Sequence, residues 1–180
     1  ILAFDIEAAR RRVESLPWIK NAQIERILPQ TIFMKVEERE PLAIWQHQGQ
    51  FSLIDDEGVV ILKDQLDHFA NLIVVVGEGA PQHAAQLIEI LSNEPQLHAL
   101  VEAAVWVGGR RWNIRLAGNI DVRLPEINPM HAWKRLGEYE RTHSVLDRDV
   151  RVLDLRMPDR LIVRKTPRKT PSINANGQKT

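Results

Sequence analysis

The sequence predicts an α+β protein, in which a helix and a β-hairpin come first and a mostly antiparallel β domain with flanking helices follows. Two observations support this fold class. Apolar residues recur at helical spacing in a few short segments, whereas in most other segments they alternate with polar residues. The chain also has 180 residues, of which 44% are hydrophobic, so it has enough apolar surface for a packed core.

The N-terminal part is predicted to be a helix followed by a hairpin. Asp5 can cap a helix that runs to Glu14, and Pro17 ends it because the residue before a proline is driven out of the helical region. Two alternating stretches with Pro29 between them then predict two strands. A small core of their own is expected for seven apolar residues: Val13, Leu16, Trp18, Ile24, Ile32, Met34 and Val36.

The polar joint at 37–41 divides the chain into units. Residues 1–41 are interpreted as a first domain and residues 42–165 as a second, and residues 166–180 are predicted to be a disordered polar tail. In the second domain, strands at 43–47 and 51–54 enclose a turn. Another turn and a strand at 59–62 come next.

A buried strand and two helices are expected in the middle of the second domain. The continuous apolar run 72–76 is typical of a strand that is covered on both faces. Pro81 opens a helix, and a shorter helix is expected around 97–101. The longer helix carries an apolar stripe formed by Ala84, Leu87, Ile88 and Leu91.

The C-terminal part is predicted to be a meander, a helix and two last strands. The meander strands lie at about 104–107, 112–116 and 120–124, with glycine-containing turns between them. Asn128 is expected to cap the helix that begins at Pro129. The helix has an apolar face of Ala132, Trp133, Leu136 and Tyr139.

The final strands are expected at 150–156 and 161–164, and only the polar tail follows them. A strand that ends a sheet leaves one row of backbone donors and acceptors unpaired. Such an edge can accept a strand from another chain. The sequence therefore predicts a protein-binding edge near the C-terminus.

Composition argues against several functional classes. The 24 basic and 24 acidic residues give a formal net charge of zero, which disfavours nucleic-acid binding, because that needs a positive surplus. Without cysteine there can be no disulfide, thiolate metal site or cysteine nucleophile. No hydrolase or metalloprotease motif occurs, so we expect no catalytic residue, cofactor, metal or small-molecule substrate. No segment reaches the roughly 18 apolar residues of a membrane span.

Three groups of residues resemble the FtsQ/DivIB family of bacterial cell-division proteins over about residues 1–165. The first group is Leu-Pro-Trp-Ile at 16–19, Arg-x-Leu-Pro-x-Thr-Ile at 26–32 and Val-x-Glu-Arg-x-Pro at 36–41. The second is Leu-Ile-Asp-x-x-Gly at 53–58. The third is Arg-Trp-x-Ile at 111–114 and Asp-Leu-Arg-x-Pro-Asp-Arg at 154–160. The three groups occur in the order and spacing of the family.

This resemblance implies a periplasmic POTRA domain followed by a β domain, anchored in the inner membrane by one N-terminal helix. It implies binding of FtsB and FtsL, contacts of the POTRA region with other divisome proteins, and a part in controlling septal cell-wall synthesis. The anchor and the first POTRA strand and helix are missing here, and the chain starts at Ile1, so it is expected to be part of a longer protein.

In the family the last strands pair with a segment of FtsB, which points to ten residues of this chain. They are Arg110, Arg111, Arg156, Met157, Asp159, Arg160, Leu161, Ile162, Val163 and Arg164.

Two other functional classes stay open at this point. The first is a POTRA-type binding module of an outer-membrane assembly or secretion system. It predicts repeated POTRA units or a barrel, and the sequence contains neither. The second is an enzyme such as a cell-wall hydrolase, which the lack of a nucleophile or metal constellation disfavours.

Overall fold

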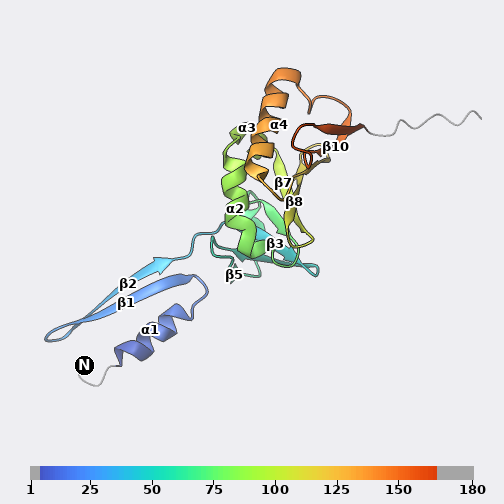
Figure 1. Cartoon of the computed structure of the whole chain (residues 1–180). Helices are drawn as coiled ribbons and strands as arrows, with labels where there is room; N and C mark the ends of the chain where they lie inside the picture. Colours follow the sequence, from blue (N-terminus) through green and yellow to red (C-terminus); the bar gives the residue numbers. More distant parts are fainter. Residues whose placement is uncertain (1–4, 166–180) are drawn as a thin grey trace, which may run out of the picture.

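The computed structural model describes residues 5–165, which form a helix–hairpin unit that projects from a larger sheet domain (Figure 1). The strands of these residues are arranged in a two-stranded sheet and a nine-stranded sheet. The α+β fold class is confirmed. Residues 1–4 and the predicted tail at 166–180 lie outside the described residues, and the division into domains stays a prediction.

The helix–hairpin unit follows the sequence pattern closely. Helix α1 spans Ile6–Glu14, and the Asp5 side chain accepts a hydrogen bond from the Ala8 amide at 2.9 Å, as predicted for its cap. Strands β1 (Ile19–Ile27) and β2 (Thr31–Glu38) then pair antiparallel. Helix α1 lies beside β1, and Ala22 of that strand is buried.

The prediction that this unit has a small core of its own is wrong. Of its seven residues Val13, Ile24 and Ile32 are half-buried and the rest are exposed, with Met34 47% and Val36 42% accessible. The register places Val36 opposite Ala22 and Met34 opposite Ile24, so these side chains do share one face. Helix α1 packs on β1, however, and no other element among residues 5–165 covers the β2 side of that face.

We expect this exposed hairpin to be the least stable part of the described chain. Because few apolar side chains are buried there, local opening should cost much less than global unfolding. In native-state hydrogen exchange at low protein concentration, amides of residues 19–36 should exchange faster than those of 111–116. Equal protection in both segments, unchanged on further dilution, would contradict this expectation.

The larger sheet is mixed, with antiparallel pairs in the majority. Its strands, in chain order, are β3 (Ala43–His47), β4 (Gln50–Ile54), β5 (Val60–Leu62), β6 (Val74–Val76), β7 (Val101–Val107), β8 (Arg111–Leu116), β9 (Ile120–Arg123), β10 (Val150–Asp154) and β11 (Ile162–Lys165). They are ordered β11-β10-β9-β8-β7-β6-β3-β4-β5. Five of these eight neighbouring pairs are antiparallel, and β3–β6, β6–β7 and β9–β10 are parallel.

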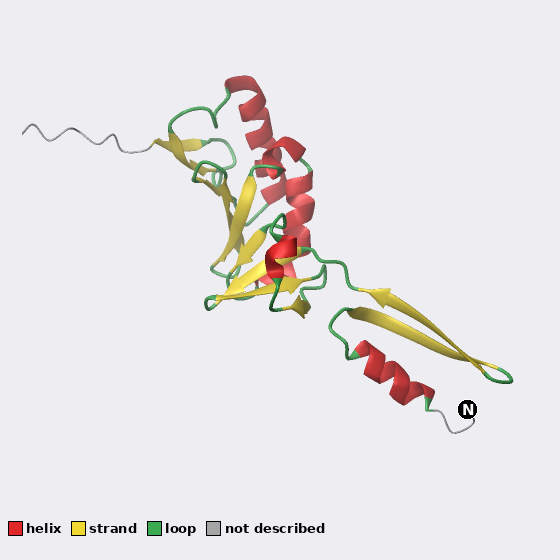
Figure 2. Ribbon diagram, turned by 180° about the vertical axis from the view of Figure 1, so that it is seen from behind, coloured by secondary structure: helices red, strands yellow, loops and turns green. Residues whose placement is uncertain are grey.

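Three helices cover one face of this sheet: α2 (Ala80–Ser92), α3 (Pro95–His98) and α4 (Pro129–His143) (Figure 2). The main core lies between them and the sheet, including residues of β3, β4 and β6 to β10, and Trp133 is its largest fully buried side chain. A smaller cluster around Ile44 and Leu53 packs with the 3-10 turn η1 (Leu66–Phe69).

The structure departs locally from the sequence-based predictions at three places. The short helix lies at Pro95–His98, before its expected place, because Val101 is already paired with Leu116 in the sheet. Asn128 precedes α4 in a left-handed conformation, and its side chain makes no capping hydrogen bond. In α2, Ile90 is buried whereas the predicted Ile88 is only half-buried.

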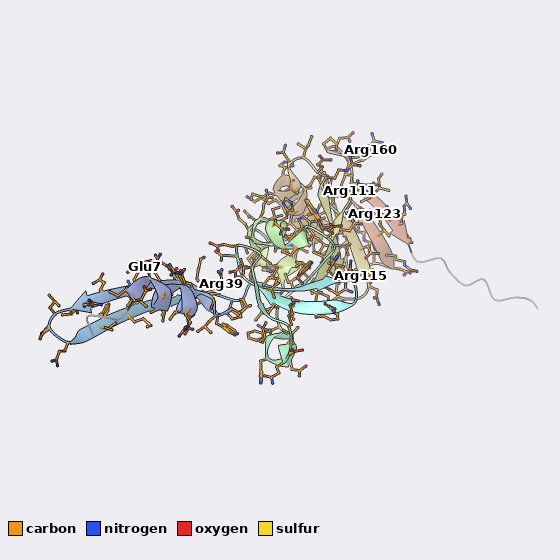
Figure 3. All side chains as sticks on the ribbon, turned by 90° about the horizontal axis from the view of Figure 1, so that it is seen from below. Glu7, Arg39, Arg111, Arg115, Arg123 and Arg160 are labelled. Carbon is orange, nitrogen blue, oxygen red and sulfur yellow. The ribbon has the colours of Figure 1, made fainter. Side chains whose placement is uncertain are left out.

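The two sheets meet at an ion-paired joint, where Figure 3 places Arg39 between the hairpin unit and the sheet domain. Arg39 Nη1 donates to Asp55 Oδ2 at 2.5 Å and to the Glu57 carboxylate at 3.3 Å. Lys20 of β1 reaches Asp56 at 3.2 Å. The turn after β4 therefore receives one cation from each side of the open end of the hairpin, Lys20 at the start of β1 and Arg39 just after β2.

Candidate partner-binding edge

Strand β11 forms one end of the nine-stranded sheet. Its inner side pairs antiparallel with β10, with Val163 opposite Leu153 and Ile162 opposite Asp154. In the part of the chain that the structure describes, no strand pairs with its outer side. One row of backbone N–H and C=O groups is therefore open, as the sequence pattern predicted.

The side chains of β11 alternate between the two faces of the sheet. Val163 shares its face with the fully buried Leu153, whereas Ile162 lies on the other face beside Asp154. Both are 40% exposed. Leu161 is half-buried against the main core and directly precedes the strand. An added strand would thus meet apolar groups on both faces.

A cavity of about 630 Å³ lies between the C-terminal end of α4 and β11. Four of the residues predicted for the site line it: Asp159, Arg160, Leu161 and Val163. Tyr139 and Val145 provide part of the opposite wall. An apolar side chain on the helix-facing side of an added strand can enter this space.

The predicted basic residues Arg110, Arg111 and Arg156 meet at a second cavity, of about 610 Å³. Arg110 belongs to the turn before β8, Arg111 begins β8, and Arg156 lies just after β10. Segments far apart in the sequence are thus brought to one place. The first turn of α4 contributes His131 to the same cavity.

Arg156 is not a free cation. Its guanidinium makes a bidentate ion pair with the buried Asp154, at 2.6 Å from Nη2 to Oδ2 and 2.8 Å from Nε to Oδ1. The hydrogen bond from Arg156 lowers the pKa of Asp154 below its usual range, although burial opposes this shift. The guanidinium of Arg156 is therefore held in one position at the lining of the cavity and places a positive charge there.

The other two arginines are less engaged. Arg110 lies 3.6 Å from Glu126, and both side chains are exposed, so this pair is weak. The Nε atom of Arg111 is buried without a hydrogen-bond partner. A carboxylate entering the cavity would meet a partly desolvated guanidinium there, which favours a charge-assisted contact.

The remaining predicted residues lie on the surface. Met157 and Arg164 are exposed, and Asp159 and Arg160 pair with each other at 3.2 Å. Sequence reasoning missed Arg135 of α4, which also lines the basic cavity and binds backbone carbonyls of the loop 155–161. A contact to backbone leaves no complementary residue type in the sequence, so no sequence signal could have identified it.

Residues 5–165 contain neither a metal-binding cluster nor a membrane-spanning helix. No group of three or more histidine or acidic side chains is placed to hold a metal ion. The described helices also include none that is long and apolar enough to cross a membrane. Fold and edge together describe a helix–hairpin unit joined to a sheet domain, in which the terminal strand β11 has no outer partner strand among residues 5–165.

Comparison with known proteins identifies the family. The family model "Cell division protein FtsQ/DivIB, C-terminal" matches residues 43–156, and "POTRA domain, FtsQ-type" matches residues 1–39. The chain belongs to the FtsQ/DivIB family of cell-division proteins, as its motifs suggested.

Several relatives carry the name "Cell division protein FtsQ". One from Bradyrhizobium diazoefficiens is 35% identical over 163 residues, which cover 91% of this chain and 48% of that protein. Another from Rhizobium meliloti is 39% identical over 167 residues, covering 93% and 54%. A third from Caulobacter vibrioides is 37% identical over 163 residues, covering 91% and 54%. The chain spans about half the length of these relatives.

Proposed function

We propose that this chain is a non-enzymatic scaffold of the divisome that binds FtsB and FtsL by β-strand addition to β11 and helps control septal cell-wall synthesis. It would act as the periplasmic part of a single-pass inner-membrane protein at the division septum. The observation that carries this proposal is that no strand among residues 5–165 pairs with the outer side of β11, in a member of a cell-division family. Family membership also favours this function over that of an outer-membrane assembly module.

Backbone pairing would provide the register of the complex, and side chains its specificity. An incoming FtsB strand would continue the nine-stranded sheet beyond β11. Alternate side chains would lie next to Ile162 on one face and next to Val163 on the other. The second set would reach the cavity between α4 and β11.

Acidic groups that flank the added strand would bind at the basic cavity. Arg111 offers a buried Nε atom without a partner, and Arg110 is bound only weakly by Glu126. The exposed cation Arg164 lies on β11 itself. The hairpin unit, with exposed Phe33 and Met34 on β2, would provide a separate surface for other divisome proteins.

Single substitutions at the edge are expected to weaken binding of the periplasmic FtsB–FtsL complex. Ile162→Asp places a charge beside the added strand and should raise the Kd at least about tenfold, equivalent to about 1.4 kcal/mol. Arg111→Glu should slow association and reduce its salt dependence. Both can be measured by surface plasmon resonance, with circular dichroism and Tm showing that each variant is folded.

A matched control is Arg115→Glu. Arg115 lies on β8, as Arg111 does, but its partner is Asp121 at 2.5 Å on β9 and it does not line the basic cavity. This variant should bind as the unmodified chain does. If the variants at Ile162 and Arg111 are folded and bind with unchanged affinity, the interface lies elsewhere and the proposal is wrong.

A further inference from the structure

The loop between β10 and β11, residues 155–161, carries much of the proposed edge but has no regular secondary structure. It includes Arg156, Met157 and Arg160, all of them exposed. A loop of this kind would normally adopt several conformations, and each of them would direct β11 differently. Something must therefore hold it in place if β11 is to present one defined edge.

Arg135 of α4 binds this loop through its backbone. Its Nη2 atom donates to the carbonyl oxygens of Met157, at 3.0 Å, and Leu155, at 3.4 Å, and its Nη1 atom donates to the carbonyl of Pro158. One planar guanidinium thus satisfies three loop carbonyls at once, which a lysine ammonium cannot do with the same geometry.

The position of Arg135 is itself fixed by the core. Its neighbours along α4, Trp133 and Leu136, are fully buried in the main core. The helix therefore cannot shift without disrupting that core, and the guanidinium is held at a defined distance from the sheet. At the start of the loop, the Arg156–Asp154 pair provides a second attachment.

We propose that Arg135 is a positioning residue for partner binding, an inference that rests on the proposed function of β11. It acts through the loop, because its Nη1 and Nη2 atoms donate to carbonyls of this chain, and this action is separate from any contact that its Nε atom makes at the basic cavity. With Arg135 in place, β11 and the basic wall formed by Arg156 keep one orientation. Without it, only a fraction of molecules has the loop in the binding conformation.

The test compares Arg135→Ala, Arg135→Gln and Arg135→Lys in the whole chain, with Lys134→Ala as a matched control. Lys134 is an exposed cation next to Arg135 on α4, and among residues 5–165 no hydrogen bond or ion pair joins it to the loop, so its loss tests the effect of charge alone.

Arg135→Ala is expected to raise the Kd for the FtsB–FtsL complex about tenfold, which corresponds to a binding-competent fraction of about one in ten. Arg135→Lys should recover part of the loss, and Lys134→Ala should leave the Kd unchanged.

Two readouts separate positioning from direct contact. In the free protein, Arg135→Ala should speed hydrogen exchange in residues 156–165 and leave that in 111–116 unchanged. The salt dependence of association should fall no more for Arg135→Ala than for the charge control Lys134→Ala, because neither substitution removes an intermolecular ion pair. A larger fall for Arg135→Ala would show that Arg135 contacts the partner, and unchanged exchange would show that it does not hold the loop. Either result overturns the proposal.

Failure of the proposed function gives a different pattern. If β11 is not the partner edge, Ile162→Asp will bind normally. If Arg135→Ala then speeds exchange in the loop without changing affinity, Arg135 holds the loop but is not a positioning residue for binding. Should Arg135→Ala not fold, the exchange and binding measurements on Arg135→Gln give the same decision.

Discussion

Replacing Trp133 by alanine is expected to lower the free energy of unfolding of the sheet domain by about 3–5 kcal/mol, the range for removing a large buried aromatic side chain. Trp133 belongs to α4 and is 0% exposed, and its side chain is part of the core that α4 and α2 form with the sheet. Its indole Nε1 donates to the Leu91 carbonyl of α2 at 3.2 Å, so the substitution also removes this hydrogen bond between α4 and α2, although the Leu91 carbonyl still accepts from the Glu94 amide at 3.1 Å. Urea unfolding followed by far-UV circular dichroism measures the change.

The control for this substitution is Ile127→Ala. Ile127 is an exposed hydrophobic residue just before α4, and its truncation should change the free energy of unfolding by less than about 0.5 kcal/mol. A loss below about 1 kcal/mol for Trp133→Ala would mean that α4 is not held to the sheet by this side chain. The rigidity that the structure assigns to Arg135 would then lose its basis.

The fold was predictable wherever one pattern is long and regular. The cap at Asp5, the alternation through β2 and the apolar faces of α2 and α4 all follow from residue spacing. The order of strands was not predictable in the same way. Parallel pairing of β6 with both β3 and β7 depends on crossovers between distant segments, and periodicity within a strand carries no information about its neighbours.

The failed core of the hairpin unit has a different cause. Alternation correctly placed Met34 and Val36 on one face, but it cannot show whether another element covers that face. Of the candidate site, too, only a part could be predicted from residue patterns. An edge at β11 followed from a last strand with only a polar tail after it, whereas the meeting of Arg111 with Arg156 came only from the family resemblance.

The family motif at 53–58 acquires a physical explanation at the joint of the two sheets. Asp55 is 0% exposed, and its Oδ1 atom accepts hydrogen bonds from the amides of Val59 at 2.7 Å and Glu57 at 3.0 Å. Gly58 has φ of +78°, and a Cβ atom there would lie 2.8 Å from the backbone of Pro81. The motif therefore builds a tight turn that packs on the start of α2 and presents a buried carboxylate to Arg39.

Burial alone would raise the pKa of Asp55, but hydrogen bonds from Arg39 and the Val59 amide outweigh it and leave the pKa below its ordinary value. The folded protein thus binds this proton more weakly than the unfolded chain does. The stability that Asp55 contributes is complete above the unfolded pKa of about 3.9 and is lost as the pH falls through the lower folded value.

Asp55→Asn is accordingly expected to lower the free energy of unfolding by about 3 kcal/mol at pH 7, near the low end for breaking a buried ion pair, because Glu57 still accepts a hydrogen bond from Arg39. The difference from the unmodified chain should begin to shrink as the pH falls below the unfolded pKa of about 3.9, because the Asp55 carboxyl of the unfolded chain then binds a proton, and it should shrink further as the pH falls through the lower folded pKa. Asp56→Asn is the matched control: Asp56 is exposed and pairs with Lys20, itself partly exposed, so its loss should matter little at any pH. Urea unfolding at each pH gives the comparison. A deficit for Asp55→Asn that stays constant down to pH 3, or an equal deficit for Asp56→Asn, would show that the buried charge of Asp55 does not stabilise the joint.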